Sequence, residues 1–228
     1  MASALKEQVL AANLELVHSG LVQFTFGNAS GIDRSGGLVA IKPSGVPYDR
    51  MTTDDIVITD LEGKIVEGKL KPSSDLATHL LLYRVFPSIG GIVHTHSTYA
   101  TAWAQSGLPI PAFGTTHADH FYGEIPATPP LTDEEIAGDY VLNTGWAIVR
   151  RLGAIDPMAM PGILVSGHAP FAWGKDVHQA AHHAALLEAV AKMAYLTMTL
   201  KADSKGVSQA LLDRHYQRKH GAKATYGQ

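Results

Sequence analysis

Apolar positions recur with the period of a helix in several segments of the chain. Between Leu5 and Leu16 they lie three or four residues apart, which predicts an amphipathic helix over residues 4–19, ended by Gly20. The sequence Thr132-Asp133-Glu134-Glu135 is a capping box, and it predicts the start of a helix that continues through residues 141–152. Further helices are expected at residues 74–84, 98–105, 176–200 and 208–219.

Short runs rich in β-branched residues, separated by turn sequences, predict paired strands. The expected strands are residues 29–32, 38–41, 56–59, 64–67, 91–94, 162–165 and 170–173. Strands and helices do not alternate regularly, so the pattern favours an α/β (α+β-like) fold with a central, mostly antiparallel sheet sandwiched between helices. No repeat or long linker divides the chain, and we expect a single domain over residues 1–228.

Composition narrows the classes of function. Hydrophobic residues make up 46% of the chain and charged residues 17%, which is enough apolar material for a core. The formal net charge of -3 gives no basic footprint, so we expect no nucleic-acid partner. No apolar run approaches the roughly 20 residues of a membrane span, so we expect no membrane partner. The absence of cysteine excludes disulfides and thiolate chemistry and favours a cytoplasmic protein.

The chain has 12 histidines, and their placement suggests a metal site. In a strand, residues two apart project from one face, so His94 and His96 can reach one point. A catalytic zinc needs at least three protein donors, and the further candidates are His168 and Asp75. Taken alone, the pair favours hydrogen-bonded core histidines over a metal site. We interpret His79, His182 and His183 as packing or surface residues, the last two as more solvated.

Three turn sequences together suit a phosphate group. Lys42-Pro43-Ser44-Gly45 follows a strand, Lys71-Pro72-Ser73-Ser74 precedes a helix, and Gly27-Asn28 lies in another tight turn. They offer hydroxyls, backbone N–H groups, two lysines and a helix N-terminus, all of which favour a dianion. Ordinary turn chemistry explains each segment equally well on its own. No glycine-rich nucleotide motif precedes a helix, so no nucleotide cofactor is expected.

At this point the sequence resembles the class II aldolase/adducin superfamily, and within it the sugar-phosphate 4-epimerases. The resemblance extends over essentially the whole chain, in several blocks that keep the family order. These blocks are Thr25 to Ser30, Ile41 to Val46, Lys71 to Asp75, Gly90 to Ser97, Gly114 to Asp119, His168 to Gly174, Arg218 to Ala224 and Tyr226 to Gln228.

The resemblance implies the family fold and a metal-dependent isomerase of carbohydrate metabolism, with arabinose catabolism as one setting. It implies interconversion of L-ribulose 5-phosphate and D-xylulose 5-phosphate through cleavage and re-formation of the C3–C4 bond. It implies a C4 homotetramer with active sites at subunit interfaces. The residues it assigns are metal ligands Asp75, His94, His96 and His168 for Zn²⁺ (with Mn²⁺ or Co²⁺ as substitutes), phosphate-binding Gly27, Asn28, Lys42, Ser44, Gly45, Ser73 and Ser74, and acid/base residues Asp119 and Tyr226.

Two other functions remain open on the same scaffold. One is a class II sugar-phosphate aldolase, although the related aldolases carry Glu where this chain has Asp75. The other is a non-catalytic, adducin-like interaction domain, against which the retained metal donors argue. Departures from the family pattern at Ser166-Gly167, Ala169, His120 and Thr225 bear on substrate preference more than on the reaction class.

Overall fold

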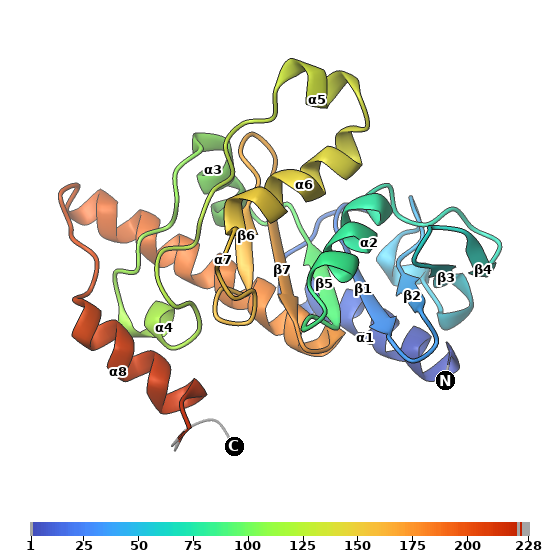
Figure 1. Cartoon of the computed structure of the whole chain (residues 1–228), viewed down its shortest axis with the longest axis horizontal. Coiled ribbons are helices and arrows are strands. Elements are labelled where there is room, and N and C mark those ends of the chain that lie inside the picture. The colour runs from blue at the N-terminus through green and yellow to red at the C-terminus, as the bar shows by residue number, and fades with distance from the viewer. Residues whose placement is uncertain (1, 223, 225–228) are drawn as a thin grey trace.

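The computed structural model describes residues 2–222 and 224, and its centre is a seven-stranded sheet (Figure 1). Every neighbouring pair of strands is antiparallel, in the order β4-β3-β2-β1-β5-β7-β6. This confirms the predicted antiparallel sheet. The strands are β1 (Asn28–Asp33), β2 (Leu38–Ile41), β3 (Val57–Asp60), β4 (Ile65–Glu67), β5 (Gly91–His94), β6 (Gly162–Leu164) and β7 (Pro170–Gly174).

Helices cover both faces of this sheet (Figure 1). The α-helices are α1 (Ala2–His18), α2 (Leu76–Val85), α3 (Thr98–Ser106), α4 (Thr115–Ala118), α5 (Asp133–Ala137), α6 (Tyr140–Leu152), α7 (Val177–Leu200) and α8 (Gln209–His220), with 3₁₀ turns η1 (Tyr48–Arg50) and η2 (Thr53–Asp55). The periodic segments predicted α1, α2, α3, α7 and α8 to within two residues at each end. None of the helices in the described residues combines the length and apolar character that crossing a bilayer requires.

The two faces of the sheet have separate apolar contents, as strand alternation requires. Val93 and Ala172 pack with α1 and the start of α7 in one cluster. Ile92 and Phe171, one residue earlier on the same strands, pack with α2 and α6 in a second cluster. The sheet is therefore sandwiched between helices. The start of β1, the end of β5 and the start of β7 lie together at one end of the central strands.

Two expectations were wrong. The helix predicted from residue 132 through residue 152 is two helices, because Gly138 is not helical and Asp139 caps α6 by accepting from the Leu142 N–H. His183 is not solvated: it is 6% exposed, and its Nδ1 lies 2.7 Å from the Trp173 carbonyl oxygen. α7 packs on more than one side, so it buries positions that a pattern with a single apolar face predicts to be exposed.

Candidate metal and phosphate site

Three histidines from distant parts of the chain meet where β5 ends and β7 begins. His94 ends β5, His96 follows it, and His168 lies in the turn between β6 and β7. Their ring centroids are 4.8 to 5.1 Å apart, and one ligand atom from each lies within 4.8 Å of the others. The register that pairs His94 with Phe171 brings the β6–β7 turn to the end of β5. The predicted convergence of these three residues is confirmed.

The ring of His94 is fixed in a single useful tautomer. Its Nδ1 donates to the Pro170 carbonyl oxygen at 2.9 Å, and the ring stacks on Phe171 at 4.2 Å. A carbonyl can only accept, so Nδ1 carries the proton and Nε2 is free to bind a metal. His94 is buried whereas His96 is exposed, so the cluster has a closed side and an open side. An open position is what a catalytic metal needs for its substrate.

Partial loss of hydration favours the neutral form of the other two imidazoles, as metal binding requires. It lowers the pKa of His168 to about 4, with the neighbouring His94 and His96 acting in the same direction. The pKa of His96 is lowered for the same leading reason. His96 and His168 are therefore neutral near neutral pH, and neutral imidazoles are good ligands for Zn²⁺ and similar ions.

Asp75 faces the same cavity but is not part of the close cluster. It occupies the N-cap position of α2, and its Oδ2 accepts from Asn28 Nδ2 at 2.6 Å. Burial raises the pKa of Asp75, but the nearby imidazoles and the Asn28 amide outweigh it and hold the pKa below its ordinary value. The carboxylate is therefore ionised beside the histidines, and its role as a ligand stays a prediction.

The phosphate segments predicted from sequence line this same cavity of about 350 Å³. A short bridge pairs two of them: the Ser44 N–H donates to the Lys71 carbonyl, and the Ser73 N–H donates to the Lys42 carbonyl. The cavity is lined by Thr25, Phe26, Gly27, Asn28, Lys42, Pro43, Ser44, Gly45, Ser73, Ser74, Asp75, His94, His96 and His168. The metal donors and the groups suited to a phosphate thus line the same cavity.

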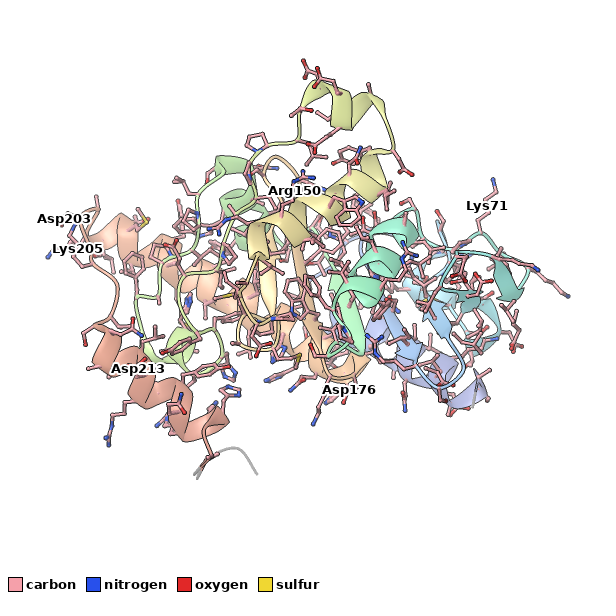
Figure 2. All side chains as sticks on the ribbon, in the orientation of Figure 1. Lys71, Arg150, Asp176, Asp203, Lys205 and Asp213 are labelled. Carbon is pink, nitrogen blue, oxygen red and sulfur yellow. The ribbon has the colours of Figure 1, made fainter. Side chains whose placement is uncertain are left out.

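Only one of the two expected lysines faces this cavity. Lys42 is 2% exposed, its Nζ donates to the Thr25 and Pro43 carbonyls, and its ammonium lies 4.7 Å from the Tyr48 ring centroid. Burial lowers its pKa. Lys71 extends into solvent from the edge of the molecule, as Figure 2 shows, so it is not part of the site.

Two aromatic residues at the site were not predicted. Phe26 is 57% exposed with its ring 6.4 Å from that of His96, and Tyr140, the first residue of α6, places its hydroxyl 3.4 Å from His168 Nδ1. The sequence signal that could have identified Phe26 was an aromatic residue directly before the Gly27 turn. Nothing in the sequence distinguishes Tyr140 from other helix-start residues.

Asp119 lies away from the histidines, at the other end of the sheet. It follows α4, and its carboxylate accepts from Arg218 (3.1 and 2.8 Å) and from His215 Nδ1 (3.0 Å), both on α8. The adjacent His120 contacts His182 near the start of α7, which follows the end of β7 remote from the metal edge. Figure 1 places α4 and α8 together at the bottom and the β6–β7 turn at the top. Tyr226 lies outside the described residues.

The α8 contacts set the charge of Asp119. Burial raises the pKa of this carboxyl, but the hydrogen bonds from Arg218 and His215 outweigh it and hold the pKa below its ordinary value. Asp119 is therefore ionised near neutral pH. It lies at a distance from the histidine cluster of its own chain, and its role as a base stays a prediction.

Comparisons with known proteins identify the family of the chain. Residues 7–195 match the family model described as the Class II Aldolase and Adducin N-terminal domain. Over 224 residues the chain is 55% identical to the L-ribulose-5-phosphate 4-epimerase UlaF of Salmonella paratyphi A, with 98% of each chain covered.

Solved structures share the fold. An L-fuculose 1-phosphate aldolase superposes with a TM-score of 0.79 at 26% identity, covering 94% of this chain and 95% of the aldolase. The L-fuculose 1-phosphate aldolase of Glaciozyma antarctica PI12 gives a TM-score of 0.77 at 20% identity, covering 97% and 84%. The chain belongs to the class II aldolase and adducin family.

Proposed function

We propose that this protein is an L-ribulose-5-phosphate 4-epimerase, an isomerase that interconverts L-ribulose 5-phosphate and D-xylulose 5-phosphate. The observation that carries the proposal is the single cavity that holds three metal-binding imidazoles beside segments suited to a phosphate. The 55% identity to an L-ribulose-5-phosphate 4-epimerase supports this substrate. A role in carbohydrate metabolism such as arabinose catabolism, and a cytoplasmic location, remain predictions.

The donor set fits a divalent metal, with Zn²⁺ preferred and Mn²⁺ or Co²⁺ as substitutes. His94, His96 and His168 would hold it, with Asp75 as the fourth ligand. When bound, the metal supplies Lewis acidity that stabilises negative charge on a substrate oxygen. No nucleotide cofactor is proposed, because cleavage and re-formation of the C3–C4 bond involve no hydride transfer.

The phosphate would be bound by the hydroxyls of Ser44, Ser73 and Ser74, the ammonium of Lys42, and backbone groups of the Gly27-Asn28 and Gly45 turns. Anchoring the phosphate keeps the glycolaldehyde phosphate fragment in place while the C3–C4 bond is broken, and the bound metal would hold the other fragment through its oxygens. A base removes the proton of the C4 hydroxyl, and the bond electrons pass to C3 and the C2 carbonyl oxygen. Glycolaldehyde phosphate turns its other carbonyl face, the C3–C4 bond re-forms, and an acid returns a proton to the C4 oxygen.

Two proton carriers are needed because the two faces of the aldehyde are opposite each other. We assign these roles to Asp119 and Tyr226. Asp119 is ionised, as a base must be, and α8 holds its carboxylate. Within one chain, however, it lies at the opposite end of the sheet from the histidines. One chain therefore holds the metal side and the base in different places, and a second copy must bring them together. This supports the proposed C4 homotetramer with active sites at subunit interfaces.

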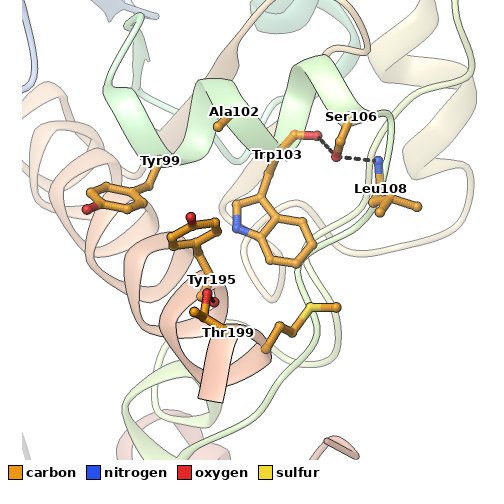
Figure 3. Close-up of a pocket in the computed structure, with 8 residues that line it drawn as sticks. Tyr99, Ala102, Trp103, Ser106, Leu108, Tyr195 and Thr199 are labelled. Atoms are coloured by element: carbon orange, nitrogen blue, oxygen red, sulfur yellow. Dashed lines mark hydrogen bonds between the residues drawn. The ribbon is translucent and has the colours of Figure 1, made fainter. Parts of the chain in front are cut away.

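A face for that second copy lies along α3 and the end of α7. Figure 3 shows the groove, a cavity of about 390 Å³ in which Tyr99 and Trp103 of α3 meet Tyr195 of α7. Leu108 is exposed at this groove, and Met193, Leu196 and Leu200 are exposed along a second cavity on α7. Apolar patches of this kind mark interaction surfaces in proteins that are otherwise polar outside.

The deciding experiment incubates the full-length protein and Zn²⁺ with L-ribulose 5-phosphate and measures D-xylulose 5-phosphate. We expect product formation that a chelator abolishes and Zn²⁺ restores, and none from a His94→Asn variant. His178→Asn is the matched control, because His178 is an exposed histidine of α7 outside the cluster. Cleavage of L-fuculose 1-phosphate without epimerisation would instead favour the aldolase, and a protein with no metal and neither activity would favour the interaction domain.

A further inference from the structure

Two polar residues on one face of β1 form hydrogen bonds with two residues at the start of α2, its N-cap Asp75 and His79. Asn28 donates to Asp75 Oδ2 at 2.6 Å, and the Ser30 hydroxyl lies 2.7 Å from His79 Nδ1. Residues two apart in a strand are separated by about 6.6 Å and residues four apart in a helix by about 6 Å, so the two pairs keep one register. The strand therefore fixes Asp75 and His79 together at the start of α2.

The hydrogen-bond chain behind His79 places its N–H on Nε2. Tyr83 is fully buried, and Ser30 Oγ at 2.8 Å is the one acceptor for its hydroxyl proton in the part of the chain that the structure describes. Ser30 then gives its own proton to His79 Nδ1. A neutral imidazole that accepts at Nδ1 carries its single proton on Nε2.

The Nε2–H group of His79 is a buried hydrogen-bond donor without a partner among the described residues. The residue is 0% exposed, and Nε2 makes no hydrogen bond to any described residue. The ring is in T-shaped contact with Phe171, which stacks on His94, and Asp75 is the carboxylate that acts on it electrostatically. Buried polar atoms without a partner are rare in folded proteins, so this one calls for an explanation.

We propose that His79 is a positioning residue for the metal site: its Nε2–H, which has no hydrogen-bond partner among the described residues, would donate to the Asp75 carboxylate when that carboxylate turns to bind the metal, and would fix it as the fourth ligand. The inference rests on the proposed function in taking Asp75 as a ligand. Carboxylate ligands are commonly oriented by outer hydrogen bonds, and loss of such a partner lowers metal affinity about 10- to 100-fold. A histidine with a purely structural role would change the unfolding temperature and leave the metal affinity of the folded protein unchanged.

The test compares two substitutions at His79 in the full-length protein by competition for Zn²⁺ with a chromophoric chelator. An Asn side chain places its amide near the Nδ1 position, whereas Gln reaches the Nε2 position. We expect His79→Asn to bind Zn²⁺ about 10- to 100-fold more weakly and His79→Gln to recover most of that loss. The visible spectrum of the Co²⁺-loaded protein should change in His79→Asn and stay close to wild type in His79→Gln.

An Asp75→Asn background shows whether the effect passes through Asp75. There, His79→Asn should cause no further loss of Zn²⁺ affinity. Wild-type affinity in His79→Asn, or an equal loss with and without Asp75, would overturn the inference. If His79→Asn does not fold, Tyr83→Phe replaces it, because it removes the proton donor to Ser30. Weaker Zn²⁺ binding by Tyr83→Phe supports the inference, and unchanged binding overturns it.

This measurement separates the inference from the proposed function. Chelator competition needs no substrate, so a protein that fails to epimerise L-ribulose 5-phosphate would refute the function while the His79 comparison stays readable. Conversely, an active epimerase whose His79→Asn variant binds Zn²⁺ normally would refute the inference alone.

Discussion

At the scale of single residues, the C-terminal tyrosine is the clearest test of the proposed proton transfer. We expect Tyr226→Phe to slow epimerisation by about 10²–10⁴, because it removes one acid/base group and no metal donor. The measurement is turnover of L-ribulose 5-phosphate together with the Zn²⁺ content of the purified protein.

Tyr216→Phe is the matched control for this prediction. Tyr216 lies on α8, and its ring packs against Tyr122 and His220. It should keep wild-type turnover, since that contact is made by the ring and survives without the hydroxyl. A Tyr226→Phe enzyme with unchanged turnover would remove Tyr226 from the mechanism.

The individual donors could be predicted to different degrees. His94 and His96 were predicted because two residues apart in a strand share a face, which is local geometry. Their meeting with His168 depends on the register of β5 against β7, which the sequence suggests only through the family resemblance. The burial of His183 was missed, because it depends on which sides of α7 are covered.

At the scale of elements, Gly91 at the start of β5 lets α7 begin directly against the sheet. A Cβ on Gly91 would lie 2.3 Å from the Cα of Val177, a backbone atom that cannot move aside cheaply. We expect Gly91→Ala to destabilise the protein by about 1–3 kcal/mol or more, the usual range for overpacking. Denaturant unfolding measures the change.

Gly114→Ala controls for the loss of a glycine as such. Its added Cβ would meet nothing within 4 Å, and its backbone is extended. We expect a change in unfolding free energy within about 0.5 kcal/mol of zero. Equal destabilisation by the two substitutions would show that the contact with α7 is not what requires glycine at position 91.

The docking of α8 should depend on pH through Asp119. The folded-state pKa of this carboxyl is depressed below its ordinary value of 3.8, so its contribution to stability is present above that value and is lost as pH falls through the folded pKa. The hydrogen-exchange protection factors of α8, which are corrected for the intrinsic effect of pH on exchange, should therefore fall in acid. Asp119→Asn should cause the same loss of protection at pH 7, whereas Asp203→Asn, in the exposed segment before α8, should not. Unchanged exchange in Asp119→Asn would contradict the prediction.

Most elements could be predicted because their signals are local. The turns at Glu62-Gly63 and residues 33–37 fix their hairpins, and apolar periodicity fixes α1 and α7. The break between α5 and α6 was missed, because the capping box and the later apolar period each fit one continuous helix. Short α4 was missed since four residues carry too little periodicity to predict a helix.

At the scale of the whole molecule, the proposed assembly should depend on the apolar groove between α3 and α7. Tyr195 is 53% exposed at this groove, so Tyr195→Asp changes no core contact while placing a charge where the second copy would pack. We expect dissociation to smaller species in light scattering after size exclusion, with loss of activity. Ile65→Asp, at an exposed position of the edge strand β4, should keep the wild-type mass. A tetrameric Tyr195→Asp protein would exclude this face.

The separation of Asp119 from the histidines leads to a prediction that only a shared site can satisfy. His94→Asn loses the metal side of every site, and Asp119→Asn loses the base of every site, so each protein alone should be inactive. If the two sides come from neighbouring chains, unfolding and refolding the two variants together restores sites in which both partners are intact. Random mixing around a ring gives about one quarter of the wild-type sites. A chain carrying both substitutions, refolded with inactive His94→Asn chains, restores none and is the control. If instead one chain supplied both groups, every mixture would stay inactive, and the placement of Asp119 beside α8 would have to be explained without a neighbour.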